Sequence, residues 1–75
     1  MEPIKIVYDE KGNTLYIRFS DKEERYCTES DIGKEVIFSR AEDGNVIGFE
    51  ILNYLPKDMK MPATLPVEAE ILKAS

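Results

Sequence analysis

The chain has 75 residues, with 15 acidic and 10 basic side chains, no histidine and a single cysteine, Cys27. This length predicts one domain over residues 1–75, which buries only about 60–65% of the surface that its unfolded chain exposes. An intramolecular disulfide is excluded, and a zinc site is not expected without histidine or a second thiolate. We therefore expect association with a partner to supply part of the stability.

The net charge of −5 disfavours binding to nucleic acid, because an acidic surface is repelled by phosphates. No apolar run approaches the roughly 18 residues that a membrane-spanning helix needs, so no membrane partner is expected. A signal-peptide pattern is also missing, and the single unpaired cysteine agrees with a reducing compartment. These features predict a cytoplasmic protein.

The first part of the chain has the pattern of a β-hairpin. Residues 4–8 alternate between apolar and polar side chains, and residues 14–19 alternate again. The turn between them contains Asp9, which can cap it, and Gly12, which tolerates positive φ. We expect a four-residue loop that pairs Ile6 with Leu15.

A second hairpin is predicted over residues 36–52, around an acidic turn that contains Gly44-Asn45. A shift of 32 positions superimposes it on the first hairpin, so that Gly12-Asn13 falls on Gly44-Asn45. The corresponding pairing joins Phe38 to Ile47. We interpret the match as two equivalent hairpins in one sheet rather than as a solenoid repeat.

Each hairpin is predicted to have an inner face, which we expect to form the core, and an outer face. The inner face comprises Ile4, Ile6, Tyr8, Leu15, Ile17, Phe19, Val36, Phe38, Ile47, Phe49 and Ile51. The outer face comprises Lys5, Val7, Tyr16, Arg18, Ile37, Ser39, Val46, Gly48 and Glu50.

Between the hairpins, residues 25–29 predict a short strand at a sheet edge or a loosely held linker. Residues 31–33 predict a turn. Cys27 lies in the short strand without a basic neighbour, so we expect a small buried side chain and not a nucleophile.

After Leu52 the alternation stops. Pro56 can open a short helical turn that continues to Lys60. Residues 65–71 alternate once more, which predicts a late strand. This strand is expected at an edge of the sheet, because Pro66 cannot donate a backbone hydrogen bond. The alternative for this segment is a short C-terminal helix with Leu65, Ala69 and Leu72 on one side.

No residues are assigned to a catalytic, cofactor-binding or metal site. Without histidine there is no Ser-His-Asp or Cys-His pair, and the glycines do not form a phosphate cradle. The carboxylates lie in turns and at outward positions, where we expect solvent. The alternative is a small-ligand binder or minor enzyme that uses carboxylates around Tyr16 and Glu50.

The outer face is half apolar, which is unusual for a fully solvated surface. Such surfaces mark contacts with another protein, here a homodimer or a small protein partner. Gly48 leaves space there for a close approach. The candidate interaction surface consists of Tyr16, Arg18, Ile37, Val46, Gly48 and Glu50. The alternative is that the C-terminal segment, with Leu55, Met59 and Met61, folds over one face.

Two stretches carry a family resemblance: Tyr8-Asp9 with residues 14–19, and residues 43–53. They resemble the small prokaryotic proteins of the domain of unknown function 2283 family, with its "YD…LYIRL" hairpin followed by a "DG" turn and a "VGIEIL" strand. The resemblance covers residues 4–55, and Ser39-Arg40 departs from the usual acidic pair. It carries over no functional residue, because the family has no established activity, and it implies a protein partner such as a small toxin.

The sequence thus predicts a mainly β fold, a small antiparallel β-meander of two equivalent hairpins with a short helical turn and a late edge strand. The function expected is a non-catalytic protein–protein interaction module, as a homodimer or with another small protein. An antitoxin-like role beside a small toxin is a further alternative.

Overall fold

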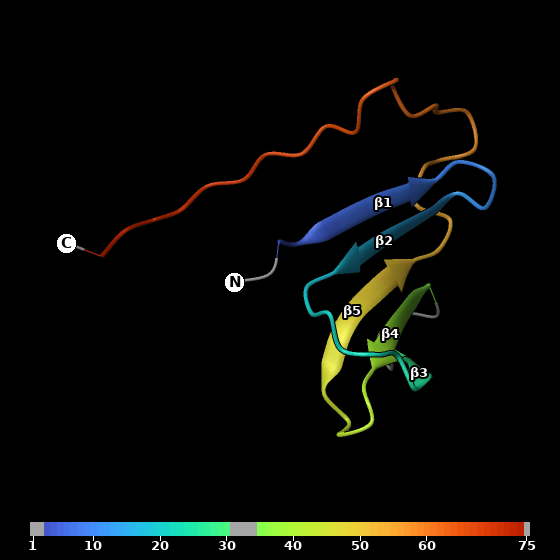
Figure 1. Cartoon of the computed structure of the whole chain (residues 1–75). Coiled ribbons are helices and arrows are strands. Elements are labelled where there is room, and N and C mark those ends of the chain that lie inside the picture. The colour runs from blue at the N-terminus through green and yellow to red at the C-terminus, as the bar shows by residue number, and fades with distance from the viewer. Residues whose placement is uncertain (1–2, 31–34, 75) are drawn as a thin grey trace.

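The computed structural model describes residues 3–30 and 35–74. Five strands form one antiparallel sheet (Figure 1), and no helix occurs in these residues. The strands are β1 (Lys5–Asp9), β2 (Thr14–Arg18), β3 (Tyr26–Glu29), β4 (Val36–Arg40) and β5 (Val46–Ile51). The predicted mainly β fold and its two hairpins, β1–β2 and β4–β5, are confirmed.

The strand order departs from that of a meander at one point. In the sheet the order is β1-β2-β5-β4-β3, so β5 and not β3 lies beside β2. Residues 19–25 cross from β2 past β5 and β4 to the far edge, as Figure 1 shows. This order joins the two inner faces, with Ile17 opposite Phe49, and leaves the short charged strand β3 at an edge. Edge strand β3 was predicted.

Both hairpins keep the predicted faces but differ in register from the expected pairing. Ile6 lies opposite Ile17 and Phe38 opposite Phe49, so each ladder is displaced by two residues. A displacement of two residues leaves the side chains of the regular ladders on the same face, whereas Val46, predicted on the outer face, pairs with Arg40 on the inner side. The 32-residue equivalence holds in the ladders, but the turns differ: Asn13 takes positive φ (50°) in the first and Gly44 (87°) in the second.

A β-bulge interrupts the second hairpin next to its turn. Ser39 pairs with Gly48 and Arg40 pairs with Val46, which leaves Ile47 as the extra residue on β5. Ile47 is only 1% exposed, and its carbonyl accepts a hydrogen bond from the Phe19 backbone N–H at 3.0 Å. The bulge thus turns Ile47 into one of the few buried side chains.

The sheet is a single layer. In the part of the chain that the structure describes, each strand contacts only its neighbours in the sheet. The buried hydrophobic side chains of this part are Leu15, Ala41 and Ile47. Phe38 and Phe49, at the centre of the inner face, are only half-buried. The expected core therefore exists only in part, because no second layer covers the inner face.

The C-terminal segment corrects two predictions. The predicted short helical turn from Pro56 to Lys60 is not seen: these residues contain one hydrogen-bonded turn, in which the Met59 N–H donates to the Pro56 carbonyl at 3.0 Å, and no helix. Residues 65–71 form neither the predicted edge strand nor the alternative helix. They lie extended with no strand beside them to complete a ladder, as Figure 1 shows. The predicted turn at residues 31–33 lies outside the described residues.

Candidate interaction surfaces

The structure places five of the six predicted surface residues on one side of the sheet. Tyr16 lies opposite Glu50, and Glu50 lies opposite Ile37, so these side chains form one row across three strands. Arg18 and Gly48 form the next row. The sixth residue, Val46, lies beyond the bulge and opposite Arg40, outside these rows.

Arg18 binds its own chain. Its Nε donates a hydrogen bond to the Ser20 carbonyl at 2.7 Å, and its guanidinium also donates to the Lys22 carbonyl. These bonds hold the crossover of residues 19–25 to the outer face at the end of β2. Arg18 therefore positions the crossover and is not an open contact residue.

Gly48 is buried and is required by the sheet itself. A Cβ at this position would lie 2.5 Å from the Ile17 carbonyl oxygen and 3.1 Å from the Arg18 Cα. The close approach that the sequence suggested is thus made by β2, not by a partner. Ser39, opposite Gly48, is fully buried. Of the candidate interaction surface, only the half-buried side chains of Tyr16, Ile37 and Glu50 are left for a contact with a partner.

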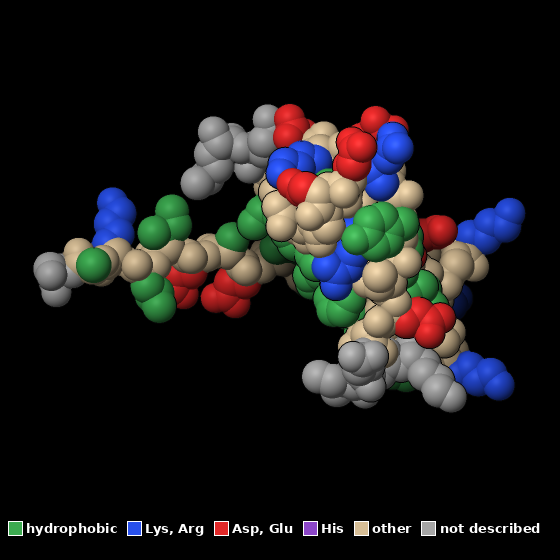
Figure 2. Space-filling model, turned by 90° about the horizontal axis from the view of Figure 1, so that it is seen from below, with side chains coloured by type: hydrophobic (Ala, Val, Ile, Leu, Met, Phe, Trp, Pro, Cys, Tyr) green, Lys and Arg blue, Asp and Glu red, His purple; other side chains and the backbone are tan. Residues whose placement is uncertain are grey.

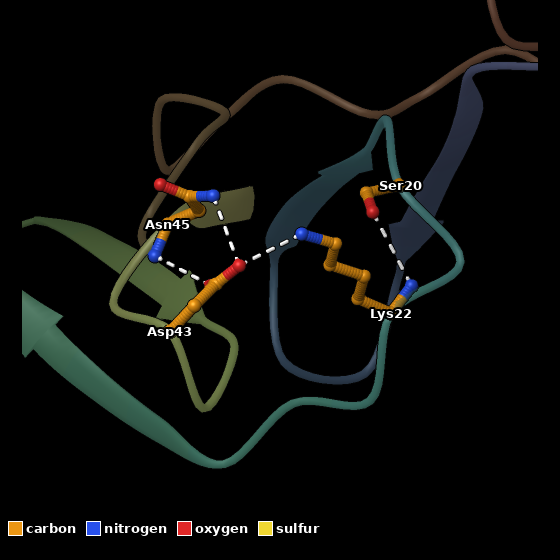
Figure 3. A network of polar contacts seen from close by, with 4 residues as sticks. All are labelled: Ser20, Lys22, Asp43 and Asn45. Carbon is orange, nitrogen blue, oxygen red and sulfur yellow. Dashed lines mark hydrogen bonds and ion pairs between the residues drawn. The ribbon is translucent and has the colours of Figure 1, made fainter.

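An ion pair ties the crossover to the turn between β4 and β5 (Figure 3). Lys22 Nζ lies 2.8 Å from Asp43 Oδ2, and Asp43 also accepts hydrogen bonds from the backbone and side-chain amides of Asn45. The hydrogen bond from Lys22, and then that from Asn45, lowers the pKa of Asp43. Because folding lowers this pKa, the pair stabilises the fold above the usual aspartate pKa and loses its effect as the pH falls through the lowered value.

A hollow of about 460 Å³ lies beside this ion pair, lined by Lys22, Glu23, Arg25, Ala41, Glu42 and Asp43. In residues 3–30 and 35–74, no three His, Cys, Asp or Glu side chains group in a way that would hold a metal ion. The same residues contain no helix long and apolar enough to cross a membrane.

Cys27 is exposed on edge strand β3, so the prediction that it is buried was wrong. Partial desolvation, and then the negative charge of Glu24, raises the pKa of its thiol. The thiol also donates a weak hydrogen bond to the Glu24 carboxylate at 3.6 Å. A raised pKa leaves little thiolate at neutral pH, which argues against a nucleophile.

The inner face is the larger apolar surface, and sequence reasoning did not single it out as a site. Its central row runs across four strands through Ile6, Ile17, Phe49 and Phe38, all half-buried. The sequence did contain one indication of this surface. A sheet face is buried by a helix or by a second sheet, and a chain with short strands and no long helical pattern has too few residues left to form either.

Two inner-face residues at one end of β1 and β2 are open to solvent. Ile4 is 65% exposed and Phe19 is 42% exposed, and strand alternation places them on the same side as Ile6 and Ile17. These two side chains extend the half-buried row into a continuous apolar surface that reaches the rim of the sheet.

Asn13 is a second feature that sequence reasoning missed. Its side-chain oxygen accepts hydrogen bonds from the Tyr8 hydroxyl at 2.7 Å and the Leu55 N–H at 3.0 Å, and its Nδ2 donates to the Leu55 carbonyl at 2.9 Å. Its own carbonyl accepts from the Tyr54 N–H at 3.0 Å. The rings of Tyr8 and Tyr54 pack with centroids 6.3 Å apart. Asn13 thus fixes the start of the C-terminal segment.

The segment that follows runs along the edge of β1 and does not cover either face. Met61 and Leu65 line a hollow with Ile6 and Tyr8 on β1, whereas Met59 is 57% exposed. The proposed covering of one face by Leu55, Met59 and Met61 is therefore limited to the sheet edge.

In the part of the chain that the structure describes, these features define a small antiparallel β-sheet fold with two equivalent hairpins and an apolar face that no second layer covers. The model of the family described as Protein of unknown function (DUF2283) matches residues 5–54, which include all five strands. The chain belongs to this family. Searches of curated proteins and of solved structures give no match.

Proposed function

We propose that this domain is a non-catalytic protein–protein interaction module of the cytoplasm, which pairs with a second copy through its inner face. The observation that carries the proposal is the half-buried row of Ile6, Ile17, Phe49 and Phe38, on a sheet that no second layer covers within residues 3–30 and 35–74. Exposed apolar surfaces of this kind mark protein contacts.

The small size of the buried core also supports association with a second copy. Leu15, Ala41 and Ile47 are the buried hydrophobic residues of the described chain. Each further Å² of apolar surface removed from water contributes about 25 cal/mol. Covering the aromatic centre of the inner face therefore stabilises a domain whose own core supplies only a few kcal/mol, about 3–5.

A homodimer is favoured over the ligand-binding alternative, because the outer-face carboxylate Glu50 lies between Tyr16 and Ile37 and not beside a second carboxylate. The central row of the inner face, by contrast, is apolar throughout. Two apolar sheets pack face to face at about 10 Å, with their side chains interdigitated.

The test compares two charged variants by light scattering coupled to size exclusion. We expect the wild-type chain to have the mass of a dimer. Ile4→Lys combined with Phe19→Lys places two charges on the exposed end of the inner face and is expected to shift the mass to that of a monomer. Both side chains are already exposed, so the substitutions cost the fold little.

The matched control is Val7→Lys, which places a charge on an outer-face side chain that is 40% exposed. We expect this variant to remain dimeric. A monomeric wild-type chain at high concentration, or an equal loss of mass in the control and the inner-face variant, contradicts the proposed dimer.

A further inference from the structure

The crossover between β2 and β3 lies over one row of the outer face. Four residues that are opposite one another in neighbouring strands form this row: Arg18, Gly48, Ser39 and Cys27. At one end of the row, Arg18 donates hydrogen bonds to the carbonyls of Ser20 and Lys22. At the other end, Cys27 donates to the Glu24 carboxylate. Because the crossover is bonded to both ends of the row and passes β5 and β4 between them (Figure 1), it covers the middle of the row.

The middle of this row is buried, whereas the neighbouring row is not. Gly48 is buried and Ser39 has no exposed surface. The next row along the strands consists of side chains that are only half-buried: Tyr16, Glu50 and Ile37. The crossover is bonded to the first row, and this difference in burial therefore follows from the crossover.

The covering leaves one polar atom without a partner. In the part of the chain that the structure describes, the Ser39 Oγ is buried and makes no hydrogen bond. Cys27 lies opposite Ser39 but donates to Glu24 instead. A buried hydroxyl group of this kind has lost its hydrogen bonds to water and has gained none in return. The cost is removed when the crossover moves away and water reaches Ser39.

The crossover is fastened by contacts that open easily. The ion pair of Lys22 with Asp43 joins it to the turn between β4 and β5 (Figure 3), and the two side chains are 52% and 47% exposed. Figure 2 views the molecule from this end and shows basic and acidic side chains gathered at the surface. Ion pairs that are this exposed stabilise a fold only weakly and are screened by salt.

We propose that the crossover is a lid, which opens from the outer face and closes on it while the sheet stays folded. The ion pair of Lys22 with Asp43 acts as its latch. Opening uncovers Gly48 and Ser39 and joins their row to the half-buried row beside it. The lid concerns the outer face alone, so it does not depend on the proposed pairing of inner faces.

Hydrogen exchange followed by NMR tests whether the lid opens locally. The Phe19 N–H donates to the Ile47 carbonyl at 3.0 Å and the Arg25 N–H to the Arg40 carbonyl at 2.8 Å, one at each end of the lid. After correction for intrinsic rates, we expect both to exchange at least about tenfold faster than the slowest amides of β2 and β5. Low concentrations of urea are expected to change these rates little, because a local opening exposes little surface. Exchange at the rate of the slowest amides, with the same dependence on urea, overturns the lid.

Removing the latch tests the role of the ion pair. We expect Lys22→Met to speed exchange at the Arg25 N–H about two- to fivefold, the range for an exposed ion pair. The matched control is Lys11→Met, which removes the same charge from an exposed side chain in the turn between β1 and β2 and is expected to leave the rate unchanged. An unchanged rate with Lys22→Met, or an equal increase with Lys11→Met, overturns the latch.

Removing the unpaired hydroxyl group tests what favours opening. Ser39→Ala is expected to slow exchange at the Arg25 N–H by at least about fivefold, because the closed lid then buries no unpaired polar atom. The Tyr54 N–H, which donates to the Asn13 carbonyl at the opposite end of the sheet, is the reference and is expected to keep its rate. Unchanged or faster exchange at Arg25, or equal slowing at Tyr54, contradicts the lid. The mass of the protein in solution tests the inner-face homodimer separately.

Discussion

Replacing Gly48 with alanine is expected to lower the free energy of unfolding by at least about 2 kcal/mol, because the new methyl group would overpack the sheet. Its Cβ would lie 2.5 Å from the Ile17 carbonyl oxygen, a backbone atom that cannot rotate away. The clash is relieved only if β2 and β5 move apart at the centre of the sheet, where Ile17 lies opposite Phe49. Urea denaturation followed by circular dichroism measures the loss.

Gly12→Ala is the matched control for this prediction. A Cβ at Gly12 would meet the Asp9 carboxylate at 3.2 Å and the Thr14 hydroxyl at 3.4 Å, both of which are side-chain atoms that can shift. Its φ is not positive, so alanine fits the turn, and we expect a change within about 0.5 kcal/mol. Similar losses for Gly48→Ala and Gly12→Ala contradict the close approach of β2 to β5.

Asn13→Ala is expected to cost about 3 kcal/mol, from three side-chain hydrogen bonds worth roughly 0.5–1.5 kcal/mol each and about 1 kcal/mol for alanine at positive φ. The bonds join Asn13 to Tyr8 and to both backbone groups of Leu55. Their loss frees residues 54–65 from the edge of β1. Denaturation measures the stability, and hydrogen exchange at the Leu55 N–H measures the release.

Asn53→Ala is the control, since Asn53 also adopts positive φ (51°). Its side chain makes an exposed hydrogen bond to Glu35 at 3.3 Å, so only the backbone cost of about 1 kcal/mol is expected. Equal losses for the two variants mean that the Asn13 side chain does not anchor the C-terminal segment.

The hairpins were predictable because alternation is a local property. The period of two assigned Ile17 and Phe49 to one face and Tyr16 and Glu50 to the other, and the structure keeps those faces. The register depends on the backbone conformation of the turns, which alternation does not encode, and in both hairpins it differs by two residues from the expected pairing. Both turns read Gly-Asn, yet Asn13 takes this role in one and Gly44 in the other.

The strand order and the role of Gly48 were not predictable from local patterns. β5 lies beside β2 through a long-range pairing in which Ile17 is opposite Phe49. Local sequence patterns do not predict pairings between residues so far apart in the chain. Gly48 was correctly marked as a point of close approach, but the approaching backbone is Ile17 of the same sheet. The candidate interaction surface proposed from the structure is the inner face and not the outer one. Alternation assigns each side chain to a face, but it does not show whether a second layer of structure buries that face.

If a second copy completes the fold by covering the inner face, the stability of the protein depends on its concentration. If two folded copies unfold together, a hundredfold rise in concentration stabilises the dimer by about 2.7 kcal/mol. We therefore expect the urea midpoint of the wild-type chain to rise clearly between dilute and concentrated samples, and to rise less with Ile4→Lys and Phe19→Lys together. A midpoint that is the same at both concentrations contradicts the proposed inner-face dimer.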